Sequence, residues 1–173
     1  MYPYFRMLAM LIKAHGGPLI SMRDETELKL RVWPSDIDFY PELNNGRHLT
    51  IMDLGRIDLV VRSGLFRILR EKKWGLSVGG ASVRYRHRLQ AFRNFTLRTR
   101  ILGLDERWFY FHQKTERGER THSAALIRAG ITSPDGLVPV SDVLRAAGEE
   151  NWKPEMPNWV SAWIKAENLR PWP

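Results

Sequence analysis

The feature that most constrains the fold of this chain is a helical segment, from Gly46 to Ser63, that is apolar on every side. On a helical wheel its apolar side chains fall on two opposite sides, with Leu49, Met52, Leu59 and Val60 on one and Ile51, Leu54 and Val61 on the other. A helix that is apolar all round is a buried helix. The rest of the chain must therefore enclose this segment.

The charged and small residues of this segment also fit a buried position. Asp53 can pair with Arg56 and Asp58 with Arg62, because side chains three or four positions apart share one helical face. Paired charges are tolerated near a core far better than single ones. Gly55 has no side chain and would let another backbone approach the helix closely there, at a cost in helix propensity.

A loop that carries carboxylates leads into this helix. It contains Asp36 and Asp38, and the consecutive asparagines Asn44 and Asn45 follow and can cap the helix start. A helix N-terminus attracts negative charge, because its first amide groups have no partner within the helix. A carboxylate before such a terminus can serve chemistry, although a plain turn or capping role is common for aspartate there.

The remaining pattern is mostly that of strands. Residues 25–33 alternate between polar and apolar, and a short helix is expected at Leu65–Lys73. Four further strands are predicted at residues 82–89, 95–101, 107–114 and 121–131, with turn residues between them. One strand, one buried helix and four consecutive antiparallel strands predict an α+β domain whose sheet wraps around the helix.

The chain divides into three expected parts: an amphipathic helix within residues 1–20, the main domain at 21–135, and a helical extension at 136–173. The extension holds four of the seven tryptophans (Trp152, Trp159, Trp163 and Trp172), a helix that Ser141 would cap, and a second helix at Asn158–Asn168. Dense aromatic residues of this kind are usually packed against the domain or a partner.

The N-terminal helix has an apolar stretch, Met7 to Ile12, that is too short to span a bilayer. Peripheral membrane contact through residues 1–15 is one interpretation, with Arg6, Lys13 and His15 facing the headgroups. The favoured interpretation is that this helix packs on its own domain or on a partner subunit. A cytoplasmic protein is expected.

The composition excludes several kinds of site. The 173 residues include no cysteine, and the five histidines lack metal-ligand spacing, so we expect neither thiolate chemistry nor a metal site. The net charge of +8 suggests an acidic partner, although a solvated basic surface is the simpler interpretation. No nucleic-acid-binding motif accompanies the charge, so no nucleic acid partner is expected and a nucleic-acid-binding module is the weakest alternative.

The loop and the helix start together carry a recognisable motif. Asp36-Ile-Asp38, followed by Leu43-Asn-Asn-Gly-Arg-His-Leu49, resembles the D-x-D-x-x-G-H-x-N-N-x-x-Y signature of hotdog-fold acyl-CoA thioesterases of the 4-hydroxybenzoyl-CoA thioesterase type. Arg84-Tyr85-Arg86-x-x-Leu89 is similar to the family's I-R-Y-x-x-P-L strand, and the asparagine segment is close to the subgroup containing the thioesterase superfamily member 6 proteins. The resemblance covers residues 25 to 132 and implies a hotdog fold, an antiparallel sheet wrapped around a long central helix.

The resemblance implies roles for the residues at this junction. Asp38 matches the family's catalytic carboxylate, which would attack the thioester carbonyl or activate a water molecule to do so. The amide groups at the helix start near Asn45 would stabilise the oxyanion that forms on the carbonyl oxygen. Asp36 is assigned to structure, and Asn44 is expected to cap the helix beside the substrate.

Further residues are expected to assist the reaction or bind the substrate. The family's Gly-His pair is Pro41-Glu42 here, and Glu42 could serve as a base in its place. The family's tyrosine is His48, which we expect to contact the substrate together with Gly46. Arg84 and Arg86 are candidates for binding the phosphates of coenzyme A.

The function that the resemblance implies is hydrolysis of an acyl-CoA to the free acid and coenzyme A. Coenzyme A enters only as part of the substrate, and no metal or redox cofactor is expected. Hotdog domains generally pair their sheets edge to edge, so a homodimer or a tetramer is expected. The replaced Gly-His pair leaves open an alternative, a non-catalytic hotdog protein that binds acyl thioesters or lipids.

Overall fold

The computed structural model describes residues 2–171. The helices in that range are α1 (Tyr4–Gly16), α2 (Asn45–Arg62), α3 (Leu65–Glu71), α4 (Val140–Ala147) and α5 (Asn158–Leu169), with a 3-10 turn, η1, at Pro34–Asp36. The strands are β1 (Thr26–Arg31), β2 (Gly75–Tyr85), β3 (Asn94–Leu104), β4 (Phe109–Arg117), β5 (Arg120–Ser133) and β6 (Gly136–Val138).

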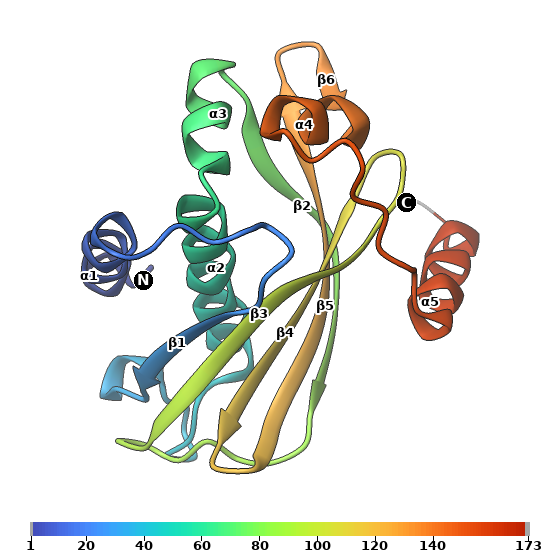
Figure 1. Ribbon diagram of the computed structural model, residues 1–173. Helices are drawn as coiled ribbons and strands as arrows, with labels where there is room; N and C mark the ends of the chain where they lie inside the picture. The colour runs from blue at the N-terminus through green and yellow to red at the C-terminus, as the bar shows by residue number, and fades with distance from the viewer. Residues whose placement is uncertain (1, 172–173) are drawn as a thin grey trace.

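The strands form one antiparallel sheet in the order β1-β3-β4-β5-β2, and the short strand β6 pairs with β5. The sheet curves around α2, while α5 lies on its other side (Figure 1). The predicted α+β domain, an antiparallel sheet wrapped around a long central helix, is confirmed. Strands β1 and β2 form the two edges of the sheet.

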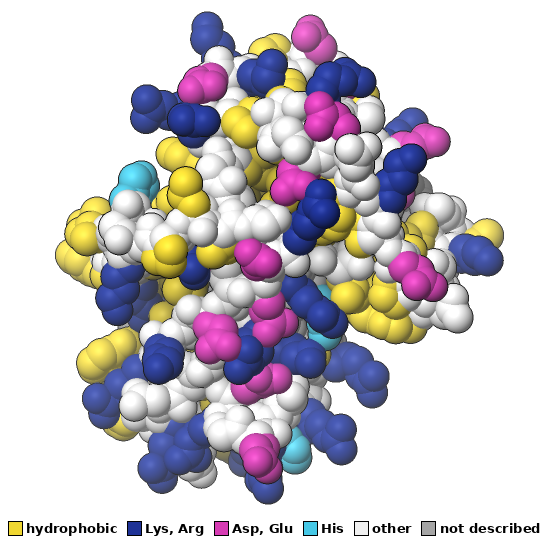
Figure 2. Space-filling model, viewed as in Figure 1, with side chains coloured by type: hydrophobic (Ala, Val, Ile, Leu, Met, Phe, Trp, Pro, Cys, Tyr) yellow, Lys and Arg dark blue, Asp and Glu magenta, His cyan; other side chains and the backbone are white. Residues whose placement is uncertain are grey.

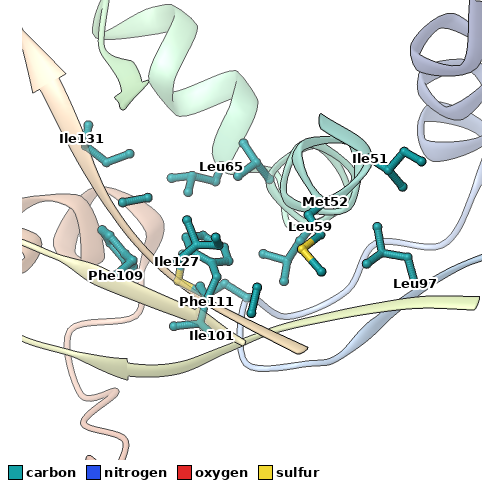
Figure 3. Close-up of a cluster of buried hydrophobic side chains, with 14 of the residues drawn as sticks. Ile51, Met52, Leu59, Leu65, Leu97, Ile101, Phe109, Phe111, Ile127 and Ile131 are labelled. Atoms are coloured by element: carbon teal, nitrogen blue, oxygen red, sulfur yellow. The ribbon is translucent and has the colours of Figure 1, made fainter. Parts of the chain in front are cut away.

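The central helix α2 is buried as predicted, but two different elements cover it. Met52 and Leu59 pack on sheet residues such as Phe111 (Figure 3). Ile51 lies on the side of α2 toward α1 and is also fully buried. The sheet was expected to provide the whole enclosure. Instead α1 packs along α2 with Met10 buried, so the N-terminal helix packs on its own domain, as the favoured interpretation held.

The sheet approaches α2 closely at Gly55, but the atoms nearest to the missing Cβ belong to side chains of the sheet and not to the second backbone that had been expected. A Cβ atom at this position would lie 2.3 Å from Thr99 Oγ1 and 2.9 Å from Gln113 Nε2, which is too close for any real contact. The buried Gln113 amide donates to Met52 O at 2.7 Å and to Thr99 Oγ1 at 2.9 Å. It accepts from Arg56 Nη1 at 2.6 Å, so a polar network fixes the helix against the sheet.

The charges carried by α2 pair as the sequence predicted. Arg56 Nη2 lies 2.9 Å from Asp53 Oδ1, and Arg62 Nη1 lies 3.6 Å from Asp58 Oδ2. Burial lowers the pKa of Arg56 despite this partner, and burial raises the pKa of Asp58. The hydroxyl of Tyr2 donates to Asp53 at 2.7 Å, which ties the residues before α1 to α2.

Strand β2 differs from its predicted span of residues 82–89. It begins at Gly75 and ends at Tyr85, because the amides of Arg86 and His87 both donate to the His122 carbonyl and so end the regular ladder. Only Arg84 of the arginines predicted to share this strand lies on it. Arg86 and Arg88 belong to the loop that follows.

One prediction about the C-terminal extension is wrong, and one strand was not predicted. Helix α4 begins at Val140 after Pro139 and has no side-chain cap, so Ser141 lies within the first turn instead of capping it. Strand β6 was not predicted, since three residues are too few to show a periodic pattern.

Within the extension, α4 packs on the main core, whereas α5 and the residues before it cover the face of the sheet opposite to α2. Val160 of α5 is fully buried against Tyr110 and Leu126 of the sheet. Met156, which precedes α5, lies over Gly103, where a Cβ atom would come within 2.4 Å of its sulfur. Trp172, one of the tryptophans expected to pack, lies outside the described residues. No helix within residues 2–171 is both long and apolar enough to cross a bilayer.

Candidate active site

The loop before α2 is held by Asp36, whose side chain is fully buried. Its carboxylate accepts the Trp33 amide at 2.9 Å and forms ion pairs with Arg47 at 2.8 Å and Arg6 at 2.5 Å. Burial alone would raise the pKa of Asp36, but the Trp33 amide and the two guanidinium groups outweigh it and hold that pKa below its ordinary value. These contacts support the structural role predicted for Asp36.

Residues 37–43 fold back on themselves and present Asp38. Ile37 and Leu43 form an antiparallel bridge, and the Asp38 amide donates to the Glu42 carbonyl at 3.2 Å. The Asp38 carboxylate caps nothing within residues 2–171, and its buried Oδ1 has no hydrogen-bond partner there. Leaving a buried carboxylate oxygen without a partner is costly. Such an oxygen is suited to meet a water molecule or a substrate.

The N-terminus of α2 offers one free amide. Asn44 is the N-cap, and its Oδ1 accepts the amides of Gly46 at 2.9 Å and Arg47 at 3.3 Å. The His48 amide donates to the Asn44 carbonyl in the first helical turn. Asn45 is the first helical residue and not a second cap. Its amide donates to no acceptor in the described part of the chain. The positive end of the helix dipole therefore ends in an available N–H group.

A pocket of about 150 Å³ opens beside this helix start. Four of the predicted site residues line it: Glu42, Asn45, His48 and Arg86. Glu42 is not a free carboxylate, because its Oε2 lies 3.2 Å from Arg88 Nε. Any role of Glu42 as a base would have to compete with this ion pair.

The other predicted residues do not line this pocket. Asp38 belongs to the adjoining turn, and Asn44 and Gly46 belong to the helix start, where Asn44 is engaged in capping. Arg84 lies on β2 opposite Ala124 and is exposed. The structure thus gathers most of the predicted residues around the start of α2 but does not bring Arg84 to the pocket.

His48 is buried and connected to the sheet by a chain of hydrogen bonds. Its Nδ1 lies 3.1 Å from Ser123 Oγ, which lies 2.7 Å from Thr115 Oγ1. Burial, with a smaller contribution from the nearby His122, lowers the pKa of His48 to about 4. The imidazole is therefore neutral at pH 7, with one nitrogen engaged by Ser123 and the ring lining the pocket.

The sequence did not single out Tyr85, Ser123 or Thr115. The Tyr85 hydroxyl donates to the Asn45 carbonyl at 2.9 Å, and its ring lies 5.1 Å from that of His48 in an edge-on arrangement. Tyr85 stood inside the quoted Arg84-Tyr85-Arg86 motif, which could have marked it. Thr115 and Ser123 are polar residues at buried strand positions, a departure from the apolar pattern that could have identified them.

Together these groups form an arrangement suited to acyl transfer. The carboxylate of Asp38, with a free buried oxygen, precedes a helix whose first amide is unoccupied, and the neutral imidazole of His48 lines a pocket together with Asn45. Amide groups at a helix start can stabilise an oxyanion, and a carboxylate can act as base or nucleophile. Within residues 2–171 no group of three or more metal-ligating side chains comes together.

The fold is shared with known thioesterases. YbaW, a probable thioesterase from Escherichia coli, superposes with a TM-score of 0.66 at 19% identity, over 72% of this chain and 96% of that one. Slr0204, a 1,4-dihydroxy-2-naphthoyl-CoA thioesterase from Synechocystis, gives a TM-score of 0.61 at 12% identity, over 72% and 95%. The sheet and its central helix therefore define a protein of the hotdog-fold class.

Sequence comparison identifies the family within that class. The profile of the thioesterase-like superfamily matches residues 32–164, which include the carboxylate turn, α2 and strands β2 to β6. Protein THEM6 from Xenopus laevis is 29% identical over 167 residues, covering 94% of this chain and 78% of that protein. The chain belongs to the thioesterase-like superfamily.

Proposed function

We propose that this protein hydrolyses an acyl-CoA thioester, with Asp38 as nucleophile or general base and the Asn45 amide as the oxyanion site. The observation that carries the proposal is that two groups, one in the turn before α2 and one at its first residue, are unsatisfied. Asp38 has a buried oxygen without a partner, and the Asn45 amide donates to no acceptor within residues 2–171. In a bound thioester, the carbonyl carbon would face the Asp38 carboxylate or a water molecule that it activates. The carbonyl oxygen, which gains negative charge during attack, would accept the Asn45 amide.

Other residues act on the substrate in supporting roles. Arg86, at the pocket, is placed to meet a phosphate of coenzyme A, while Arg84 on β2 could do so only at the outer surface. Gly46, with no side chain, and the neutral ring of His48 leave the helix start open to the thioester. No metal or other cofactor is needed for this chemistry.

The active form is proposed to be a homodimer or a tetramer. Strand β2 is an edge strand, so its outer hydrogen-bonding groups are available to the same strand of a second copy. Light scattering coupled to size exclusion would test this proposal. A mass of 20.2 kDa, that of one chain, would overturn it.

The proposed activity is tested by measuring thiol release from a panel of aromatic and aliphatic acyl-CoAs. Replacing Asp38 with Asn or Ala should lower kcat/KM by about 10²–10⁴-fold, the usual contribution of a general base. Asp135→Asn is the matched control, because Asp135 is an exposed carboxylate in the turn between β5 and β6. Full activity of Asp38→Ala would overturn the assigned mechanism.

One specific observation keeps a binding function as the second candidate. Glu42, at the position of the family's histidine, is held in an ion pair with Arg88, so Asp38 lacks the assistance that the family pattern implies. A non-catalytic protein would bind acyl-CoA, measurable by calorimetry, and turn over none of the panel. Turnover of any acyl-CoA that depends on Asp38 would exclude this candidate.

A further inference from the structure

Helix α1 is apolar on both of its sides but covered on only one. Met10 and Ala14 are buried toward α2. The opposite side presents Tyr4, Phe5, Leu8 and Ile12, and the Phe5 side chain is 92% exposed. A helix of this kind in water normally has a second contact surface, because contiguous exposed apolar side chains mark interaction sites. We call these four residues the outer face of α1.

Exposed aromatic residues at the end of β1 form a second apolar group near α1. Arg6 of α1 donates to the Arg31 carbonyl at 3.2 Å, which places the start of α1 against that strand end. The Arg31 guanidinium lies over the rings of Trp33, at 5.3 Å, and Phe92, at 5.9 Å, and both rings are about half exposed. In Figure 2 yellow side chains gather over α1 and below it, with dark blue ones between.

The backbone holds one of these aromatic residues outward. Phe92 has φ of +61°, a conformation that is costly for a residue with a side chain. Its amide donates to the Val32 carbonyl at 2.9 Å, and its carbonyl accepts from Arg31 Nε at 3.0 Å. The loop is thus fixed so that an aromatic ring stays at the surface beside arginine.

Basic side chains border the same surface. A pocket of about 500 Å³ lies between α1, the end of β1 and the end of the β3–β4 pair. Four cationic residues line it (Arg6, Lys29, Arg31 and Arg117), with Glu116 as the one carboxylate among its described lining residues, and Glu116 is itself paired with Arg98. The surface next to the apolar face is therefore positively charged.

The acidic residues near this surface offset only part of that charge. Asp36 neutralises Arg6, which therefore faces the domain and not the headgroups, and Asp53 is paired with Arg56. Lys29, Arg31 and Arg117 form no ion pair within residues 2–171. An apolar and aromatic surface bordered by unshielded cations matches the chemistry of an anionic bilayer, where rings enter the headgroup region and cations meet lipid phosphates. A second copy of the chain is a poorer match, because two such surfaces would bring like charges together.

We propose that this protein docks peripherally on anionic membranes through the outer face of α1 together with Trp33, Phe92 and the basic pocket beside them. The surface lies along the β1 side of α2, at the opposite edge of the sheet from β2, so the dimer proposed above leaves it free. The inference does not depend on catalysis. It gives the N-terminal helix a use beyond covering α2.

The test is co-sedimentation of the full chain with phosphatidylcholine vesicles, with and without phosphatidylglycerol. The wild type should bind only the anionic vesicles, less strongly as salt is raised. Phe5→Ser combined with Leu8→Ser should weaken binding by about tenfold or more, since two inserting side chains are lost. Leu169→Ser is the matched control: Leu169 is 85% exposed on α5, away from this surface, and its replacement should leave binding unchanged.

A second variant tests the charge separately. Lys29→Glu combined with Arg31→Glu should remove the preference for phosphatidylglycerol while α1 stays intact, which circular dichroism would verify. Failure of the wild type to bind anionic vesicles would overturn the proposal, as would unchanged binding by both double variants. If Phe5→Ser with Leu8→Ser lowers the mass measured by light scattering, the surface joins copies of the chain and the proposal is wrong.

Discussion

Replacing Gly55 with alanine should destabilise the fold, although alanine is the better helix former. The added Cβ would meet Thr99 Oγ1 at 2.3 Å, Leu97 Cδ2 at 2.8 Å and Gln113 Nε2 at 2.9 Å. Leu97, Thr99 and Gln113 are fully buried, so none of them can move into solvent. Either α2 moves away from the sheet or the Gln113 network breaks.

The magnitude follows from three contributions. Overpacking a well-packed core costs about 1–3 kcal/mol. Displacing the Gln113 amide from Met52 and Thr99 leaves buried polar groups without partners, at about 1–3 kcal/mol. The higher helix propensity of alanine stabilises the variant by about 1 kcal/mol in the opposite direction. The expected loss in the free energy of unfolding is therefore about 3 kcal/mol.

Urea unfolding followed by circular dichroism would measure this loss. With a slope of about 2 kcal/mol per molar urea, the midpoint should fall by about 1.5 M. Gly16→Ala is the matched control: Gly16 ends α1, and nothing lies within 4 Å of the Cβ it would gain. A Gly55→Ala protein as stable as the wild type would show that the helix and the sheet are not in close contact there.

Two further predictions concern the buried charges around the site. Asp36→Asn should cost about 3 kcal/mol at neutral pH by leaving two guanidinium groups without their carboxylate. The difference should shrink in acid, because the stability from Asp36 is complete above its ordinary pKa of 3.8 and lost as the pH falls through its lower folded pKa. His48→Phe should make the protein less sensitive to acid. The His48 imidazole takes up a proton near pH 6.5 in the unfolded chain but only near pH 4 in the folded one, so lowering the pH through this range costs the wild type up to about 3 kcal/mol of stability that the variant keeps. Urea midpoints at neutral and acid pH would check both, and an equal fall for wild type and His48→Phe would contradict the second.

Local sequence patterns were sufficient for the central part of the fold. The distribution of apolar residues between Gly46 and Ser63 required a buried helix, and α2 spans Asn45–Arg62. Gly55 marked a point of close approach to α2, although the sequence did not show that side chains of the sheet make it. Packing of the N-terminal helix on its own domain was an expected outcome, but that it covers α2 in particular was not, since the contact between the two helices is specified by neither pattern.

The site was predictable only where one segment contains it. The loop with Asp38 and the start of α2 are contiguous in the chain, so the motif predicted both. The chain of hydrogen bonds from His48 requires Thr115 to lie opposite Ser123 on β4 and β5, and this register is set by tertiary packing. The end of β2 likewise depends on the His122 carbonyl, far away in sequence.

The position of α5 has a consequence for how copies of this protein can assemble. Val160 and Met156 occupy the sheet face that points away from α2, and Met156 fills the space over Gly103. Two sheets cannot stack through this face unless both copies first release their C-terminal segments and expose Tyr110 and Leu126 to water. The C-terminal segment thus occupies this face of the sheet, and a contact between copies of the chain that leaves the segment in place must use another surface.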